Sequence, residues 1–352
     1  MNNSDNFELS FSIHLTILKM KNSKPIDYEL EKNMEVTSQL DGFVANAVDT
    51  ILVDPDECWQ PTDFLPDFSN PEVFEEIKQL QKRAEGIPDT VLTSLIGNMI
   101  TEEALPSYQT YFNLLQGINE ERSLLSPSGW VRWSKAWTAE ENRHGDLLNK
   151  YLYMTGRVDM KAVEQTIHRL LTNGFDPKSK SDPYQAMVYT SFQERATKIS
   201  HVNTGKLADK AGDSVLSRIC KTIAGDEARH EKAYKSFMSQ IFEIDPSGAV
   251  LAFEKMMRNQ IVMPAVLMGE GGKNPDLYTH FSAITQKVGI YTGWDYARII
   301  EHLVDLWKID SLTGLNDAAS KAQSYLSNLA DRYMRLADRM KAPDEIKLAW
   351  LK

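Results

Sequence analysis

The sequence predicts an all-α fold, with a bundle of four long helices embedded in a larger single helical domain. Apolar residues recur every three or four positions over long stretches, whereas the alternating runs typical of strands are scarce. Short breaks rich in proline, glycine and serine separate these stretches. Long helices with long connections are typical of a bundle with further helices packed around it.

The breaks define the expected elements in chain order. Residues 1–33 are expected to be a tail, 34–341 the helical domain, and 342–352 a short C-terminal tail. The four long helices are expected at about 89–117, 129–155, 183–203 and 214–242. Further helices are expected at about 246–265, 276–289, 293–307 and 315–340.

The composition excludes several classes of protein. The 352 residues carry a formal net charge of −10, which does not favour nucleic acid as a partner. The two cysteines, Cys58 and Cys220, lie far apart and can form neither a disulfide framework nor a cysteine-rich metal site. No apolar run approaches the roughly 20 residues that cross a bilayer. Residues 1–25 contain early acids and no arginine, so no secretory signal or transit peptide is evident.

A carboxylate and an imidazole share the apolar stripe of the helix expected at 214–242. Glu227 and His230 lie on that stripe, three positions apart. The other members of the stripe are Leu216, Cys220, Ile223, Tyr234 and Phe237. The nearby Arg229, Glu231 and Lys232 fall off the stripe and are interpreted as a solvated surface. Burying a carboxylate beside an imidazole is costly without compensation, so the pair requires a further partner.

A second Glu-x-x-His pair, Glu141 and His144, interrupts the apolar stripe of the helix expected at 129–155. Its apolar neighbours on that stripe are Trp137, Leu148 and Tyr151. Glu140 lies near this stripe but not on it. Four other histidines lack a glutamate three residues earlier and are interpreted as structural or surface residues. They are His168, His201, His280 and His302.

Each pair follows another helix that carries an acid in its stripe. In the helix expected at 183–203 the acid is Glu194. In the helix expected at 89–117 it is Glu102 or Glu103, and periodicity alone does not separate these two. The resulting order on four helices is Glu, Glu-x-x-His, Glu, Glu-x-x-His.

This order predicts a dinuclear metal site in a ferritin-like carboxylate bundle. Four buried carboxylates carry a charge of about −4, which two divalent cations neutralise. Mixed carboxylate and imidazole ligands favour iron or manganese over a structural zinc ion. Asp226 is expected to accept a hydrogen bond from His144 across the bundle and so to orient that ligand.

Several longer segments carry a family resemblance. They are CWQPTDFLPD, TEEALPSYQT, WTAEENRHGDLLNKYLYMTGRVDM, TSFQERAT, DEARHEKAY and FEIDPSGAVLAFEKMMR. Through them the chain resembles, from about residue 34 to 341, the soluble plant desaturases that act on acyl chains attached to acyl carrier protein (ACP). The resemblance implies a homodimer with a ferritin-like di-iron bundle, hence two iron ions, in each subunit.

The resemblance also implies roles for individual residues and favours Glu102 over Glu103. The implied iron ligands are Glu102, Glu141, His144, Glu194, Glu227 and His230. Thr197 would lie beside the oxygen-binding site. Trp59, His144 and Asp226 would carry electrons from the surface.

The implied reaction removes two hydrogens from a saturated acyl chain on ACP and leaves a cis double bond. Reduced ferredoxin supplies two electrons and dioxygen becomes water. Because unactivated C–H bonds lie beyond side-chain acid–base catalysis, a cofactor must supply this chemistry. The resemblance places such an enzyme in the plastid stroma.

The residues expected to line the substrate channel are Tyr111, Leu114, Leu115, Ala186 and Met187. Four of them differ from the common delta-9 stearoyl pattern, where Met, Thr, Gly and Phe stand in place of Tyr111, Leu114, Ala186 and Met187. Lys273 falls near a position where delta-9 enzymes tend to carry an acid, at the candidate entrance for the carrier. These departures favour a regiospecific variant, such as a delta-4 palmitoyl-ACP desaturase with some delta-9 stearoyl-ACP activity. A plain delta-9 enzyme is the alternative.

Two other classes share the ligand order. In a ribonucleotide reductase small subunit, the first metal ligand in the chain is normally Asp. That family also has a radical Tyr one turn after the His of its first Glu-x-x-His motif, where this chain has Leu148. A ferritin-like iron-storage protein is usually about half this length and has no acyl channel. Membrane desaturases are excluded, because the chain lacks their transmembrane segments and histidine clusters.

Overall fold

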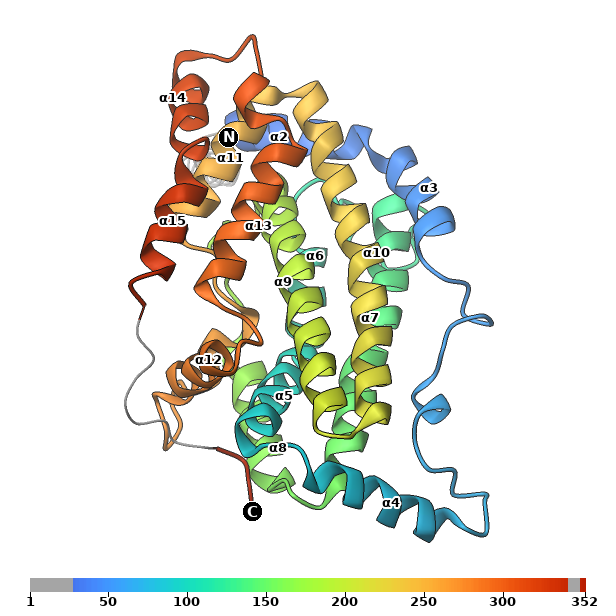
Figure 1. Cartoon of the computed structure of the whole chain (residues 1–352). Coiled ribbons are helices and arrows are strands. Elements are labelled where there is room, and N and C mark those ends of the chain that lie inside the picture. The colour runs from blue at the N-terminus through green and yellow to red at the C-terminus, as the bar shows by residue number, and fades with distance from the viewer. Residues whose placement is uncertain (1–27, 341–348) are drawn as a thin grey trace, which may run out of the picture.

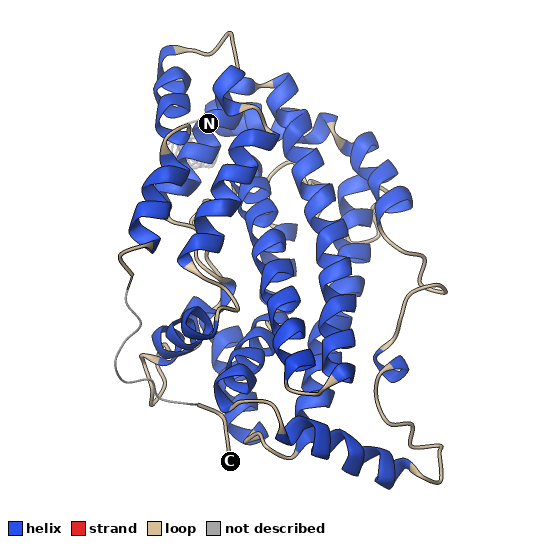
Figure 2. Cartoon of the chain, viewed as in Figure 1, coloured by secondary structure: helices blue, strands red, loops and turns tan. Residues whose placement is uncertain are grey.

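The computed structural model describes residues 28–340 and 349–352, which are mostly helical (Figures 1 and 2). The N-terminal elements are α2 (Tyr28–Gln39), α3 (Asp41–Ile51), the 3₁₀ helix η1 (Pro61–Asp63) and α4 (Val73–Glu85). The central elements are α5 (Asp89–Glu102), α6 (Leu105–Asn113), α7 (Gly129–Thr155), α8 (Met160–Asn173), α9 (Pro183–Lys210) and α10 (Ser214–Ile244). The C-terminal elements are α11 (Pro246–Asn259), η2 (Pro264–Leu267), α12 (Leu277–Val288), α13 (Gly293–Leu306), η3 (Ile309–Ser311), α14 (Asp317–Leu326) and α15 (Leu329–Ala337).

Helices α5, α7, α9 and α10 form the central bundle. Figure 1 shows α9 and α10 side by side along the length of the molecule, and this pair has the most extensive contact between elements. Helix α5 contacts both α7 and α9, and α7 contacts α10. The predicted all-α bundle within a larger helical domain is therefore confirmed. Within the described residues, no helix has both the length and the apolar character of a membrane span.

Local sequence signals fix the ends of the long helices. The Ser128 hydroxyl accepts a hydrogen bond from the Val131 amide at 3.2 Å and caps α7. Asp213 caps α10 in the same way, through the Leu216 amide at 2.9 Å. Helix α7 ends at Gly156, whose φ of 72° lies in the left-handed region that glycine adopts without strain.

The bundle interior consists of two apolar cores with a polar layer between them. Trp130 of α7 and Phe237 of α10 belong to the first core. Tyr151 of α7 and Ile219 of α10 belong to the second. Along each of these two helices the Glu-x-x-His pair lies between the two cores. The polar layer is therefore closed off at both ends by packed apolar side chains.

The helix expected at 89–117 is two helices. Helix α5 ends at Glu102, and α6 begins at Leu105 with Pro106 in its first turn. Proline has no amide hydrogen and its ring clashes with the preceding turn, so α5 cannot continue through it. Glu102 consequently lies at the C-terminal end of α5 and not in the middle of a long helix.

Other helix boundaries also differ from expectation. The helix expected at 246–265 ends at Asn259, because Gln260 has a φ of 58° that an α-helix does not allow. The helix expected at 315–340 divides into α14 and α15. Helices α2, α3, α4 and α8 had no counterpart among the expected elements.

Parts of the two expected tails are structured. Helix α2 begins at Tyr28, inside the segment 1–33, and residues 1–27 lie outside the described part. At the other end, residues 341–348 lie outside the described part, but Trp350 is buried and its indole donates to the Thr166 hydroxyl at 3.0 Å. Leu351 pairs with Val158 in an antiparallel bridge. The chain end therefore packs against the start of α8.

Replacing Trp350 with alanine is expected to lower the free energy of unfolding by about 3 kcal/mol, because a buried aromatic side chain and its hydrogen bond are lost. Chemical denaturation monitored by circular dichroism measures this change. Trp294, 37% exposed, provides the control, since Trp294→Ala removes little buried area. Equal effects of the two substitutions would contradict a stabilising role for the C-terminal contact.

Candidate metal centre

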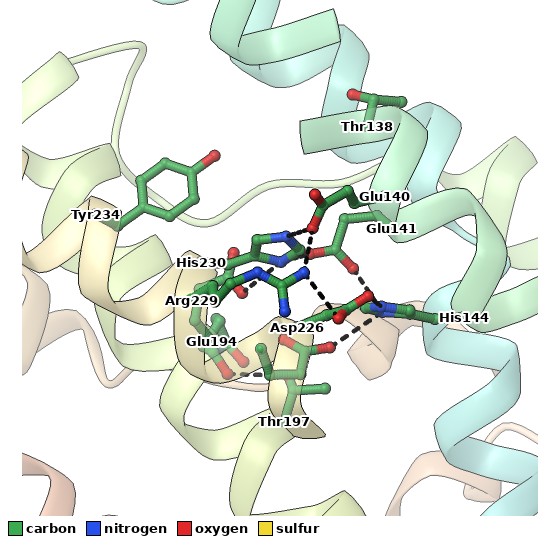
Figure 3. Close-up of polar contacts among 12 residues, drawn as sticks. Thr138, Glu140, Glu141, His144, Glu194, Thr197, Asp226, Arg229, His230 and Tyr234 are labelled. Carbon is green, nitrogen blue, oxygen red and sulfur yellow. Dashed lines mark hydrogen bonds and ion pairs between the residues drawn. The ribbon is translucent and has the colours of Figure 1, made fainter. Parts of the chain in front are cut away.

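Six side chains from four helices converge in the polar layer. Figure 3 labels four of them, Glu141, His144, Glu194 and His230. Helix α7 provides Glu141 and His144, and α10 provides Glu227 and His230. Helix α9 provides Glu194, and the end of α5 provides Glu102. All six are buried, and both histidines are 0% exposed. The structure thus brings together every ligand candidate, including Glu102 of the pair that periodicity left open.

The six side chains form two overlapping groups of candidate ligands. One group is Glu102, Glu141, His144 and Glu227, and the other is Glu141, Glu194, Glu227 and His230. Within each group the ligand atoms lie within 4.8 Å of one another. Glu141 and Glu227 belong to both groups, so these two carboxylates would help to hold both of two cations bound here.

The atoms that point into each group suit a cation. His144 Nδ1 and His230 Nδ1 are buried without a hydrogen-bond partner among the described residues, as are Glu194 Oε2 and Glu227 Oε1. Their nearest neighbours are other ligand atoms: His230 Nδ1 lies 2.6 Å from Glu141 Oε1, and His144 Nδ1 lies 3.0 Å from Glu141 Oε2. Buried polar atoms without partners are rare and costly. Shared coordination of metal ions would satisfy all four.

Acidic side chains outside the two groups orient both histidines. His144 Nε2 lies 3.3 Å from Asp226 Oδ2, which is the contact expected from the sequence. His230 Nε2 lies 2.9 Å from Glu140 Oε2. Arg229 donates to Asp226 Oδ1 at 2.8 Å and to Glu140 Oε2 at 2.9 Å, and so joins the two acids. With each Nε2–H donating outward, each Nδ1 presents its lone pair to the metal site.

Without a cation, the cluster takes up protons. Burial raises the pKa of the Glu194 carboxyl well above its usual range, and the Glu141 and Glu227 carboxylates raise it further. Burial lowers the pKa of His230, but the Glu141, Glu140 and Glu227 carboxylates together outweigh burial and raise this pKa to about 9. Divalent cations would displace these protons and stabilise the charged carboxylates in their place.

Trp59 lies on the outer side of His144. Its indole donates to Asp226 Oδ2 at 3.0 Å, and its ring is stacked on that of His144, with centroids 6.1 Å apart. The guanidinium of Arg143 lies 4.4 Å above the Trp59 ring. Trp59 is partly exposed, so this chain of contacts links the surface to the candidate ligand His144.

A cavity of about 80 Å³ adjoins the cluster on the side of α6 and α9. Four of the candidate ligands line it, and Thr197 lines it beside them. The Thr197 hydroxyl donates to the Gln193 carbonyl at 2.9 Å. The rest of the wall is largely apolar and aromatic. It includes Leu105, Tyr108, Phe112, Trp137, Phe175 and Tyr189. An apolar chain bound in this cavity would lie directly against the candidate metal site.

Comparison with known proteins assigns the family. The sequence model of a family described as fatty acid desaturase matches residues 32–351. A stearoyl-ACP 9-desaturase of Ricinus communis is 50% identical over 308 residues, which cover 88% of this chain and 77% of that protein. An acyl-ACP desaturase of Cucumis sativus gives the same identity and coverage. Both relatives are described as chloroplastic.

The chain belongs to the acyl-ACP desaturase family. Among solved structures, the DesA2 protein of Mycobacterium tuberculosis H37Rv is similar, with a TM-score of 0.52 and 18% identity. That match covers 79% of this desaturase and 97% of the mycobacterial chain, and supports the ferritin-type helical fold. The predicted enzyme class, an oxidoreductase of this family, is confirmed.

The residues expected to form the substrate channel of this desaturase divide into three groups. Tyr111 lines the cavity. Leu115, Ala186 and Met187 are buried in the neighbouring apolar core and do not line it. Leu114 is 67% exposed, because α6 ends at Asn113 and turns this side chain outward. Lys273 is exposed, in the loop between η2 and α12.

Sequence patterns missed several functional contacts. Glu140 orients His230, although it lies off the apolar stripe. His201, interpreted as structural or surface, is fully buried, and its Nε2 lies 3.0 Å from Glu102 Oε1. Its partner is on another helix, so no spacing within α9 could signal the contact. Glu103, the competing choice, accepts instead from the Asn149 amide at 2.9 Å.

The residues beside His230 that were expected to form a solvated surface are only partly exposed. Lys232 is exposed as predicted, and Arg229 is half-buried between Asp226 and Glu140. Glu231 is 1% exposed, which contradicts the expectation. Its carboxylate pairs with cations on two helices. They are Arg195 at 2.7 Å, Lys235 at 2.6 Å, and Lys198.

Replacing Glu140 with glutamine is expected to weaken metal binding about 10–100-fold, because His230 loses the carboxylate that holds its orientation. Asp226→Asn should have an effect of the same order through His144. Metal retained during titration with a chelator measures the affinity. Glu301→Gln, an exposed change on α13, provides the control and should have no effect. Unchanged affinity in both site variants would contradict the orienting role of the two acids.

Proposed function

We propose that this protein introduces a cis double bond into a saturated acyl chain carried on ACP, using dioxygen and two electrons from reduced ferredoxin. The observation that carries the proposal is the joint geometry of the site: two candidate metal positions share Glu141 and Glu227 and adjoin a largely apolar cavity. The descriptions of the plant relatives supply the substrate class, stearoyl-ACP or acyl-ACP.

We infer that the two positions hold iron. Glu102 and His144 would help to hold one ion, Glu194 and His230 the other, and Glu141 and Glu227 belong to both groups. Carboxylate and imidazole ligands suit iron in such bundles. Bound iron would supply the redox chemistry with dioxygen that breaking an unactivated C–H bond requires. The protein must then hold the acyl chain and exclude water from the site.

The chain's own residues perform those tasks in the proposal. The cavity wall presents one methylene pair of the acyl chain to the side where Glu102, Glu194 and Thr197 lie. Asp226 and Glu140 keep the two histidines in the orientation that binds metal. Trp59, through its contacts with Asp226 and His144, is the proposed route by which ferredoxin's electrons arrive.

For the bond position we favour delta-4 on palmitoyl-ACP, with some delta-9 activity on stearoyl-ACP. Delta-4 placement on a 16-carbon chain leaves more carbons beyond the reacting pair than delta-9 placement on an 18-carbon chain, so it needs a deeper cavity. The cavity described here is smaller than such a chain, so side chains at its aromatic end must move on binding. Lys273 at the proposed carrier entrance and Tyr111 in the wall are the departures that support the variant. The 9-desaturase relatives support plain delta-9 activity as the alternative.

The remaining expectations follow from the same family relationship. We propose that the active protein is a homodimer in the plastid stroma. The chloroplastic description of the relatives supports the location.

Product analysis tests the proposed reaction. Wild-type protein loaded with iron is incubated with reduced ferredoxin, dioxygen and either palmitoyl- or stearoyl-ACP, and mass spectrometry locates the double bond. The expected main product is delta-4 palmitoyl chain, and Glu227→Ala should lose both iron and product. Only delta-9 stearoyl product would rule out the variant. Iron uptake and oxidation without any double bond would favour a storage protein.

Tyr111→Ala is expected to raise the rate of delta-4 desaturation of stearoyl-ACP relative to palmitoyl-ACP about tenfold or more. At the same bond position the stearoyl chain places two more methylenes beyond the reacting pair, and removing the ring makes room for them at about 1–3 kcal/mol each. Tyr111 and Phe175 line the cavity with ring centroids 5.3 Å apart, and the Tyr111 hydroxyl contacts Ser179. Leu114→Ala, an exposed change from the same expected set, should leave the ratio unaltered. A ratio that responds to Leu114 and not to Tyr111 would contradict this assignment of the wall.

A further inference from the structure

A line of oxidisable aromatic side chains leads away from the metal site. Trp137 lines the cavity together with Glu141 and Glu194. Its ring centroid is 5.9 Å from that of Tyr234, which is 5.6 Å from that of Trp133. The Trp133 indole also donates to the Tyr234 hydroxyl at 3.1 Å. The first three members of the line are therefore in direct contact.

The line continues to a surface hollow. Trp133 and Trp130 both pack against Phe237, with ring centroids 5.1 and 5.3 Å from it. Trp130 lines a hollow of about 180 Å³ that it shares with Asp41 and Asn119. The three tryptophans recur at positions 130, 133 and 137 of α7, so they lie along one side of that helix. Figure 3 shows Tyr234 beyond His230, on the side of the cluster away from His144.

Packing alone does not require these residue types. Phenylalanine or leucine would fill the same core without burying a polar hydrogen. Here both indole N–H groups need buried acceptors. The Trp133 indole donates to the Tyr234 hydroxyl, and the Trp130 indole donates to the Thr37 carbonyl at 2.9 Å. Trp137 Nε1 is buried without a partner among the described residues, which costs stability. Apart from the cysteine thiol, indole and phenol are the side chains most easily oxidised by one electron, and this property is what the four residues share.

We propose that Trp137, Tyr234, Trp133 and Trp130 form a relay that supplies electrons to the metal centre when it has reacted with dioxygen but no acyl chain is bound. The proposal rests on the proposed function, in which the centre holds iron. It is separate from the route through Trp59, which lies against His144 on the other side. The relay protects the ligands from oxidation by an idle centre.

The electron count defines what the relay must deliver. Reducing dioxygen to two waters takes four electrons and four protons. Ferredoxin gives two electrons, and the two C–H bonds of a bound acyl chain give the other two with their hydrogens. Without an acyl chain, two electrons leave Trp137 in successive steps and are replaced through Tyr234 and Trp133 from Trp130. Two thiol molecules in solution then restore Trp130, releasing two protons and forming one disulfide, while solvent supplies the protons at the cavity.

The test uses hydrogen peroxide as the oxidant and needs no acyl substrate. Iron-loaded wild-type, Trp133→Phe and Tyr234→Phe proteins are treated with peroxide with or without a small thiol, and oxidised tryptophans are mapped by peptide mass spectrometry. Wild-type protein should show oxidation reaching Trp130 that the thiol suppresses. In Trp133→Phe, oxidation at Trp137 should rise severalfold, oxidation at Trp130 should fall, and the thiol should no longer protect.

Controls separate the relay from general damage. Trp307→Phe changes a tryptophan that is also buried but packs against Phe242 and Phe253, outside the line, and should match wild type. Metal-free protein reveals oxidation that does not start at the centre. Iron content and unfolding temperature establish that each variant is intact.

Three results would overturn the relay. The first is an identical oxidation map in wild type and Trp133→Phe. The second is oxidation confined to the exposed Trp294. The third is a variant that slows reduction of the centre by ferredoxin while its oxidation map is unchanged. Desaturation of acyl-ACP is measured separately on the same preparations, so loss of the proposed function and loss of the relay give different results.

Discussion

The electrostatic cost of four carboxylates in a closed interior governs this structure. Two apolar cores exclude water from the layer between them, so the charges can be balanced only by protons, cations or neighbouring side chains. Glu141 and Glu227 belong to both candidate metal positions and are therefore central to that balance. The raised pKa of Glu194, caused by burial and then by these two carboxylates, expresses the same cost in the metal-free protein.

The surrounding side chains are arranged to support that layer. Arg229 connects Asp226 and Glu140, so the supports of the two histidines form one hydrogen-bonded unit across α7 and α10. This unit lies on the side of the cluster that faces Trp59, and the apolar cavity lies on the other. In the proposed function, this arrangement separates electron supply from substrate and keeps the polar network out of contact with the acyl chain.

Periodicity alone identified most of the site. Glu227 and His230 interrupt an apolar stripe, and a strong stripe makes such an interruption visible in one sequence. Glu194 was harder to find, because α9 is buried on several sides and its stripe is weak. Glu140 and His201 could not be found this way, since each acts through a residue on a different helix. The channel residues illustrate the same limit: whether Leu114 faces inward depends on where α6 ends, which spacing does not specify.

The break at Pro106 has a mechanical consequence. Five of the six candidate ligands lie within long helices, whereas Glu102 is the last residue of α5. The Tyr108 hydroxyl donates to the Thr101 carbonyl at 2.9 Å, and Tyr108 is itself part of the cavity wall. A chain that displaces Tyr108 therefore pulls on the turn that carries Glu102. The end of the centre that carries Glu102 is thereby coupled to the contents of the cavity through a single hydrogen bond.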